Sequence, residues 1–189
     1  SDVNAEISIS EYATREDLAA VYRLIAYFGM DDIIHTHVSA RLPAEPDKLL
    51  INRYGDLFRE VTPESLAVID HDGNLVRGPQ VPINTAGIVI HTAVHAARPD
   101  AACVVHTHTP AGVAVSCLEE GLLPLNQTAL LFHGQLAYHS FEGIALDKEE
   151  QVRLVADLGD KRAMILRNHG LLTVGRTIGE AFSLMYNLE

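Results

Sequence analysis

The stretch that most constrains this chain is an apolar run that ends in two histidines, Ala101-Ala102-Cys103-Val104-Val105-His106-Thr107-His108. Because the side chains of a β-strand alternate between its faces, His106 and His108 would lie on one face, close enough to bind one cation through neutral ring nitrogens. A second apolar run leads to Arg167-Asn168-His169-Gly170 and also ends in a polar turn. The sequence therefore predicts a metal site of His106, His108 and His169 where buried strands give way to loops.

One isolated histidine is usually a hydrogen-bonded structural residue, so the prediction depends on all three members of the set. The same His-Thr-His spelling occurs earlier, at His35-Thr36-His37. No third ligand in a comparable strand-end context follows it, and chelation needs at least three convergent ligands. We therefore expect the earlier pair not to form the metal site.

The length of the chain favours a single domain over residues 1–189, because 189 residues can bury a substantial core without disulfides. No apolar run approaches the ~20 residues that span a bilayer, and no signal-peptide pattern opens the sequence. Cys103 and Cys117 have apolar neighbours that suit reduced thiols, which favours a cytoplasmic location. The sequence stops at Glu189 inside a helical pattern, so we expect the natural polypeptide to continue.

The net charge opposes one class of partner. The chain has 14 basic and 25 acidic residues, a formal net charge of -11 spread along its length. A polyanion would be repelled, so we expect no nucleic-acid partner. We also expect no membrane partner, because no apolar run is long enough to span a bilayer, and the partner that we expect is a small-molecule substrate.

Several segments read as helices from their apolar spacing or their caps. Residues 14–28 have a helical period with Thr14 and Asp17 as an N-terminal capping box, and Asn84 or Thr85 can cap the next helix. The other expected helices are 84–97, 111–119, 147–158 and one that begins at 178, with a short helical turn at 61–66.

Expected strands lie between these helices, at 31–42, 49–52, 67–70, 74–77, 101–108, 130–138, 164–169 and 171–174. We interpret 67–77 as a surface hairpin across Asp72-Gly73. Strands and helices mix without regular βαβ alternation. This predicts an α/β fold of three α/β/α layers around a largely antiparallel sheet.

Five segments, in order along nearly the whole chain, resemble the class II aldolase/adducin domain family. They are His37-Val38-Ser39-Ala40-Arg41, Val61-Thr62-Pro63-Glu64, His91 with Ala97-Arg98-Pro99-Asp100, Val105-His106-Thr107-His108 and Arg167-Asn168-His169-Gly170. The resemblance implies an α/β/α fold, a divalent metal, usually zinc, at His106, His108 and His169, and a cyclic homotetramer. Asn84-Thr85-Ala86-Gly87 and His108-Thr109-Pro110-Ala111-Gly112 look more like the adducin head domain and its bacterial relatives than the sugar-phosphate aldolases.

The chain departs from the aldolase pattern at the positions of the acid/base and of the phosphate. The aldolases have a glutamate four residues before the histidine that matches His91, and that position is Gly87 here. The substrate positions carry His37 for an asparagine, Tyr54 for a serine and Thr85-Ala86 for paired serines. Phosphate recognition needs several converging donors, so we expect sugar phosphates to be poor substrates.

Two functions remain open. The first is a metal-dependent lyase that cleaves a carbon-carbon bond of a small hydroxy-carbonyl or carboxylic-acid substrate, by retro-aldol reaction or decarboxylation. The second is a non-catalytic, adducin-head-like oligomerisation domain that retains the metal site. The sequence names no catalytic base; His37, Tyr138, His139 and Glu142 are polar candidates, and His91 or His95 is expected to support the site. Decarboxylation needs no such base, because loss of carbon dioxide itself generates the carbanion.

Overall fold

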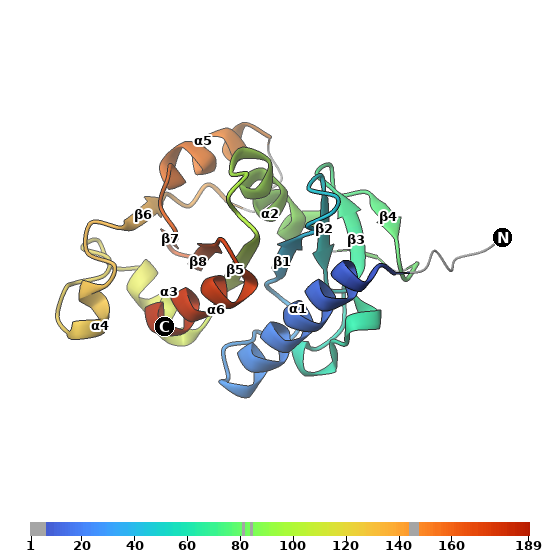
Figure 1. Cartoon of the computed structure of the whole chain (residues 1–189). Helices are drawn as coiled ribbons and strands as arrows, with labels where there is room; N and C mark the ends of the chain where they lie inside the picture. Colours follow the sequence, from blue (N-terminus) through green and yellow to red (C-terminus); the bar gives the residue numbers. More distant parts are fainter. Residues whose placement is uncertain (1–6, 81, 84, 144–147) are drawn as a thin grey trace.

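A mixed β-sheet forms the middle layer of the protein. A computed structural model describes residues 7–80, 82–83, 85–143 and 148–189, and its eight strands run in the order β4-β3-β2-β1-β5-β8-β7-β6 (Figure 1). The strands are β1 (Val38–Arg41), β2 (Lys48–Ile51), β3 (Ala67–Asp70), β4 (Leu75–Arg77), β5 (Cys103–Thr107), β6 (Leu136–His139), β7 (Ala163–Leu166) and β8 (Gly170–Gly175). Among these strands β6 and β7 are the one parallel pair. The prediction of a largely antiparallel sheet is confirmed.

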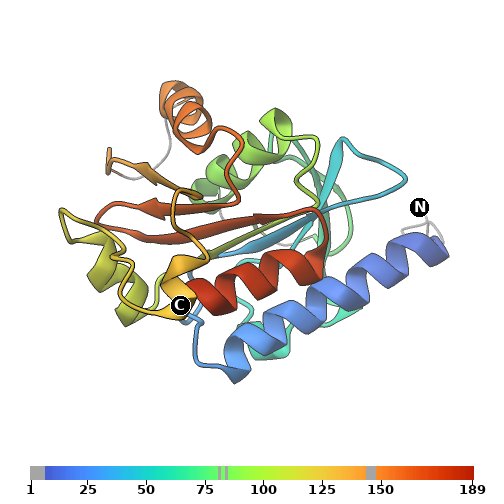
Figure 2. The same ribbon diagram turned by 60° about the vertical axis from the view of Figure 1, so that its left-hand side comes forward.

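Helices cover both faces of this sheet. On one face α1 (Ile9–Tyr27) and α6 (Ile178–Leu188) lie side by side, and on the other α2 (Thr85–Ala97) packs beside α5 (Lys148–Leu158) (Figure 2). The remaining helical segments are α3 (Pro110–Ser116), α4 (Gln127–Leu130), η1 (Phe58–Glu60) and η2 (Pro63–Ser65). The expected three-layer α/β/α architecture is therefore confirmed.

The alternation of side chains along β5 separates two cores. Cys103 and Val105 belong to the core beneath α1 and α6, whereas Val104 belongs to the core beneath α2 and α5. Because the strand has a period of two residues, His106 faces the same side as Val104. The first predicted ligand thus lies on the α2 face of the sheet.

Strand direction gathers several histidines at one edge. β5 and β7 both run antiparallel to β8, so they share a direction, and β6 runs parallel to β7. The carboxyl ends of β5, β6 and β7 therefore meet at one edge. β1 runs antiparallel to β5 and begins at that same edge, directly after His37.

The first helix begins earlier than the sequence predicted. Its N-cap is Ser8, whose hydroxyl accepts the Glu11 N–H at 3.1 Å, so the predicted capping box at Thr14 is wrong. Thr14 lies inside the helix. The first turns carry no apolar period because they are anchored by a buried ion pair, Arg15 with Glu11 at 2.8 Å, rather than by apolar side chains.

The first strand is shorter than predicted. The segment before Val38 is a loop with an isolated bridge between Asp32 and His35, and Ile33 and Thr36 have positive φ angles of 54° and 65°. Side chains rarely adopt this left-handed region, and it interrupts an extended strand. The prediction of a strand from residue 31 is therefore wrong for residues 31–37.

Smaller boundary differences lie elsewhere. Residues 127–130 form α4, so the strand expected over 130–138 is confirmed only in its last part, β6. α3 ends at Ser116, three residues before the predicted end. The expected 67–77 hairpin is present, but β3 is buried rather than superficial. Val68 packs into the core beneath α1, and Ile69 packs against Ile88 of α2. Asn84 and Asp147, expected at helix starts, lie outside the described residues.

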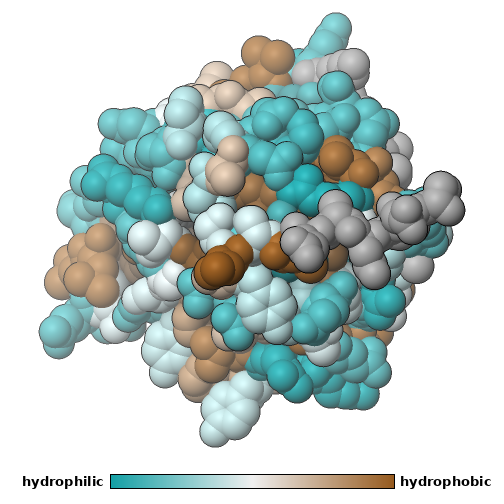
Figure 3. Space-filling view, turned by 45° about the vertical axis from the view of Figure 1, so that its right-hand side comes forward, coloured by the Kyte–Doolittle hydropathy of each residue, from teal (hydrophilic) through white to brown (hydrophobic). Residues whose placement is uncertain are grey.

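Within the part of the chain that the structure describes, no helix is both long enough and apolar enough to cross a membrane. The face seen in Figure 3 is mainly hydrophilic, with apolar side chains gathered in small groups. A single domain over residues 1–189 remains an expectation, in keeping with the continuous sheet.

Candidate metal site

Three imidazole rings come together at the shared strand edge. His106 lies near the end of β5, His108 just beyond it, and His169 between β7 and β8. The ring centroids of His106 and His108 are 4.6 Å apart, and each lies 4.8 Å from the centroid of His169. One ring nitrogen from each residue lies within 4.8 Å of those of the other two. The structure thus brings together the three predicted ligands in an arrangement that could hold a divalent cation.

Hydrogen bonds orient two of these rings. His106 Nδ1 lies 2.8 Å from the Leu171 carbonyl oxygen, which can only accept, so Nδ1 carries the proton and Nε2 the lone pair. His108 Nδ1 donates in the same way to Asp32 Oδ2 at 3.1 Å. His108 Nε2 is buried without a hydrogen-bond partner among the described residues. A lone pair left in this way fits a metal ligand.

The third ring is placed by a tight turn between β7 and β8. Asn168 has a left-handed φ of 57°, and Ser116 supports the turn through its carbonyl oxygen, 2.9 Å from the Asn168 N–H, and its hydroxyl, 3.2 Å from the His169 N–H. A Cβ atom at Gly170 would lie 2.2 Å from the Thr107 carbonyl oxygen. Only glycine therefore allows the turn to approach β5 this closely.

The environment keeps the rings of His106 and His169 neutral. Burial lowers the pKa of His106 well below its ordinary value, and the neighbouring His169 and His108 lower it further. Burial, followed by His108 and His139, lowers the pKa of His169 to about 4. Neutral imidazoles are the form that binds metal, so near pH 7 the group is ready to coordinate.

His37 occupies the space beside Gly87. A Cβ atom added at Gly87 would lie 2.2 Å from His37 Cδ2 and 2.4 Å from its Nε2. His37 Nδ1 donates to Asn52 Oδ1 at 2.9 Å, which leaves the lone pair on Nε2, buried and without a hydrogen-bond partner among the described residues. Burial lowers the pKa of His37, and His108 lowers it further. The space where the resemblance to aldolases implies a glutamate is thus filled by a neutral imidazole from the loop before β1.

The imidazole of His91 is held by a chain of hydrogen bonds that runs from His95 through Ser39. His95 Nδ1 lies 3.1 Å from the Ala101 carbonyl oxygen and must donate to it, so the Ser39 hydroxyl donates to His95 Nε2 at 2.8 Å. Ser39 Oγ then accepts from His91 Nδ1 at 2.6 Å. The lone pair of His91 therefore lies on Nε2, a buried atom with no hydrogen-bond partner in the part of the chain that the structure describes. The His91 ring centroid lies 6.1 Å from that of His37.

The direction of this chain requires neutral histidines. Burial lowers the pKa of His91 well below its ordinary value, followed by the effects of His37 and His95. Burial and then Arg41 lower the pKa of His95 to about 3. The sequence predicted that His91 or His95 supports the metal ligands. Both helix histidines bond to Ser39 instead, and Leu171 and Asp32 hold the Nδ1 atoms of His106 and His108, so that supporting role stays a prediction.

Several other residues singled out by sequence are exposed, pack elsewhere or have side chains outside the described residues. His35 is exposed and His37 is buried, so the earlier His-Thr-His pair does not share a face. Tyr54 lies in the loop after β2 with 45% of its surface exposed. Thr85 begins α2, but its side chain lies outside the described residues. Tyr138 stacks beneath the Arg167 guanidinium, 4.6 Å from the ring centroid, which is a packing role.

Sequence reasoning missed three supporting residues, Asp32, Ser39 and Asn52. Asp32 was assigned to a strand, and its contact with His108 joins positions 76 residues apart. Ser39 stood inside a quoted motif without a role. Nothing local distinguishes these polar residues from others in the chain, because their function depends on which ring each one meets.

Comparison with known proteins places the chain among aldolases and adducins. Residues 16–189 match the family described as class II aldolase and adducin N-terminal domain. Alpha-adducin of Rattus norvegicus is 45% identical over 181 residues, covering 94% of this chain and 24% of that protein.

Solved structures agree with this match. An aldolase II superfamily protein from Pseudomonas syringae superimposes with a TM-score of 0.95 at 50% identity, covering 97% of this chain and 73% of that chain. L-fuculose 1-phosphate aldolase from Glaciozyma antarctica PI12 superimposes with a TM-score of 0.86 at 30% identity, covering 100% of this chain and 74% of that chain. The relatives therefore include proteins that correspond to each of the two expected functions.

Proposed function

The chain belongs to the class II aldolase and adducin N-terminal domain family, and from this membership and the three-histidine group we propose that it is a metal-dependent carbon-carbon lyase. Its substrate class is a small hydroxy-carbonyl or carboxylic acid, and its cofactor is a divalent metal, for which we propose zinc, one of the metals that imidazole ligands suit. The observation that carries the proposal is the convergence of His106, His108 and His169, with two rings oriented from behind.

The residues of the site support this chemistry. Three neutral imidazoles leave the full charge of a bound cation in place and one coordination position open, as catalytic rather than closed structural zinc sites do. When bound, the metal supplies Lewis-acid polarisation of a substrate carbonyl. The protein contributes orientation, through the Leu171 carbonyl and the Asp32 carboxylate, and burial keeps His106 and His169 unprotonated.

His37 is the proposed proton acceptor in place of the absent glutamate. Its Nε2 lies where a side chain at Gly87 would project, and its Asn52 contact keeps that nitrogen free of its own proton. A positioned base contributes ~10²–10⁴-fold to proton transfer. This assignment adds a retro-aldol route to decarboxylation, which needs no base.

The lone pairs of His37 and His91 indicate which chemical groups of a substrate the site would accept. Both Nε2 atoms are acceptors, whereas a phosphate needs converging donors. A substrate hydroxyl or C–H proton would interact with these two acceptor atoms more favourably than a phosphate would. We therefore propose substrates that lack a phosphate, and poor cleavage of fuculose 1-phosphate.

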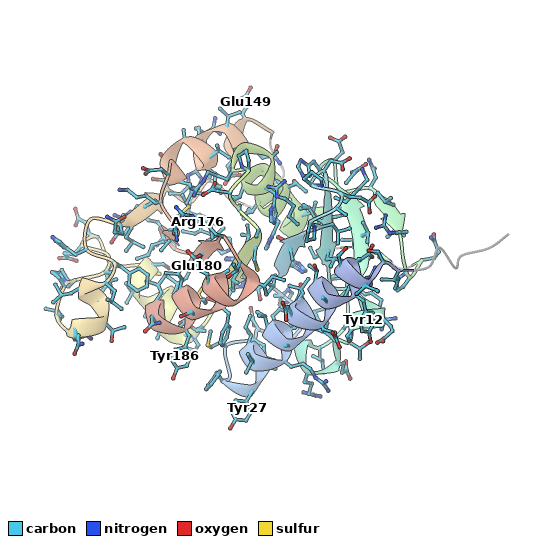
Figure 4. All side chains as sticks on the ribbon, viewed as in Figure 1. Tyr12, Tyr27, Glu149, Arg176, Glu180 and Tyr186 are labelled. Carbon is cyan, nitrogen blue, oxygen red and sulfur yellow. The ribbon has the colours of Figure 1, made fainter. Side chains whose placement is uncertain are left out.

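An oligomer is part of the proposal. Tyr27, Phe28, Phe182 and Tyr186 form an aromatic cluster at the ends of α1 and α6, and Tyr27 is 82% exposed. Tyr27 and Tyr186 both project from this end of the molecule (Figure 4). Burial of such side chains between copies would stabilise a homotetramer. Light scattering at micromolar concentration measures it, and a monomer would contradict the proposal.

The second candidate is a non-catalytic oligomerisation domain, which the identity with alpha-adducin favours. For either function we propose a cytoplasmic location, which suits Cys103 and Cys117, both free thiols.

Zinc-loaded protein tested against a panel of small hydroxy-keto acids, hydroxy-aldehydes and β-keto acids separates the two candidates. The lyase proposal expects turnover of at least one substrate that disappears in His106→Ala. Equal rates for the two proteins on every substrate, with metal binding intact in the wild type, would instead support the oligomerisation domain.

A further inference from the structure

A second group of metal-type ligands lies at the same strand edge. It consists of His139 at the end of β6, Glu142 three residues later and Glu150 in the first turn of α5. One ligand atom from each lies within 4.8 Å of those of the other two. None of these residues belongs to the three-histidine group.

The buried imidazole of this group points a lone pair at the two carboxylates. His139 is 4% exposed, and its Nδ1 lies 2.7 Å from Asp157 Oδ2. Because a carboxylate accepts, Nδ1 donates, and in the neutral form of the ring the lone pair lies on Nε2. That Nε2 is buried and has no hydrogen-bond partner among the described residues. A carboxylate behind a histidine is the arrangement that orients metal-bound imidazoles.

The distances suit ligands of one ion better than they suit hydrogen bonds. His139 Nε2 lies 3.5 Å from Glu142 Oε2 and 3.6 Å from Glu150 Oε1. An N–H···O bond would be about 2.9 Å long. Two ligands bound tetrahedrally at ~2.0–2.2 Å lie roughly 3.4 Å apart, close to both separations. A doubly protonated His139 has one Nε2 proton and would approach one carboxylate rather than stay equally far from two.

The charges of the side chains around this group are consistent with a bound cation. Glu150 is 7% exposed, and a buried carboxylate needs a compensating positive charge. Arg153 donates from Nε to both oxygens of Glu142, at 2.9 and 3.1 Å, which holds that carboxylate beside His139 and leaves a lone pair on each oxygen. The carboxylates of Glu142, Glu150 and Asp157 and the guanidinium of Arg153 together carry a formal charge of -2, which one dication would balance.

A small cavity adjoins these ligands. Its volume is about 20 Å³, and its lining includes His139, Glu150, Phe141 and His169. One water-sized sphere occupies ~10–15 Å³, so the cavity has room for a single ion or water. Because His169 also lines it, the group borders the three-histidine site.

We propose that His139, Glu142 and Glu150 form a second divalent-metal site, for zinc or a similar transition-metal ion, with Asp157 orienting the imidazole. The ion would link the end of β6 to the start of α5 and stabilise the segment that lies beside His169. The second site shares no ligand with the three-histidine group, and its existence does not depend on the proposed lyase activity.

The test uses chelator-treated protein titrated with Zn²⁺, and with Co²⁺ as a spectroscopic probe, in a His106→Ala background that lacks the first site. We expect one ion per chain in this background and its loss on adding Glu150→Gln. Glu149→Gln is the matched control, since Glu149 lies in the same helical turn but points away from the molecule (Figure 4). Asp157→Asn should weaken binding ~10–100-fold.

Glu142→Gln provides a second removal at a partly exposed position, in case Glu150→Gln does not fold. No binding at ~1 mM Zn²⁺ by folded His106→Ala protein, or unchanged affinity in both glutamine variants, would overturn the proposal. Wild-type protein that binds metal but shows no lyase activity would contradict only the proposed function, because the second site is measured without the first.

Discussion

The chain contains the tripeptide His-Thr-His twice, and the two copies have different structures. In His106-Thr107-His108 the backbone continues an extended strand, and both rings turn to one side, with centroids 4.6 Å apart. In His35-Thr36-His37 the middle residue has a φ of 65°, and one ring is exposed while the other is buried. Spacing therefore places two side chains on one face only where the backbone between them is extended.

Removal of one ring from each copy should give the largest contrast. We expect His106→Ala to weaken metal binding at the three-histidine group by more than ~100-fold, because a lost ligand costs more than a lost orienting residue. His35→Ala should leave affinity unchanged, since His35 is exposed and outside the group. Co²⁺ titration of the two variants measures both, and a similar loss in His35→Ala would contradict the assignment.

We propose that the His37 ring takes the space that a glutamate side chain at position 87 would fill. Restoring the aldolase-type residues, Glu at position 87 and Asn at position 37, tests this. Gly87→Glu alone should destabilise the protein by ~3 kcal/mol, because its Cβ would overlap the His37 ring. Adding His37→Asn, which removes the ring, should recover most of that loss. Urea unfolding of the single and double variants measures both, and an equally unstable double variant would contradict the shared space.

Acid should destabilise the metal-free protein through the buried rings. The folded-state pKa of His169, about 4, is below the unfolded value of ~6.5, so the unfolded chain binds the proton first. Stability should be full above pH ~6.5 and fall as the pH drops toward 4, by about 1.4 kcal/mol per pH unit for each such histidine. His91 and His106 shift in the same direction.

Thermal unfolding in chelator at pH 7, 6 and 5 measures this loss. Exposed His35 serves as the comparison, since His35→Ala should leave the pH dependence unchanged. A Tm that is constant across this range would show that the rings are not buried in their neutral form.

Replacing the middle threonine of each His-Thr-His copy, Thr36 or Thr107, with glycine should have the smallest effect on stability, and the two effects should differ in direction or size. Thr36 is left-handed, and its buried hydroxyl has no hydrogen-bond partner among the described residues, so Thr36→Gly should be neutral or stabilising by up to ~1 kcal/mol. Thr107→Gly should destabilise by ~1 kcal/mol or more, because Thr107 is in a strand and its hydroxyl donates to Glu189. Calorimetry of the pair measures the difference, and equal losses would remove the backbone explanation.

Local pattern was enough to predict most elements and the three histidines whose rings meet. Apolar alternation and the residues that follow it predicted β5 and the His169 turn, because burial of one strand is visible in its own sequence. Local signals failed where a distant partner decides the conformation. α1 extends to Ile9 because Glu11 pairs with Arg15, and no apolar period marks that turn.

The sequence by itself determined which residues could bind a metal and which strands could bring them together, since imidazole chemistry and two-residue alternation are local properties. Only the tertiary structure decided which rings meet and which nitrogen of each ring carries the proton. Asp32, Asn52 and Ser39 set those tautomers from distant positions in the chain. His139 and Glu150 meet through the pairing of β6 with β7 and the packing of α5 on β6, which no local pattern encodes.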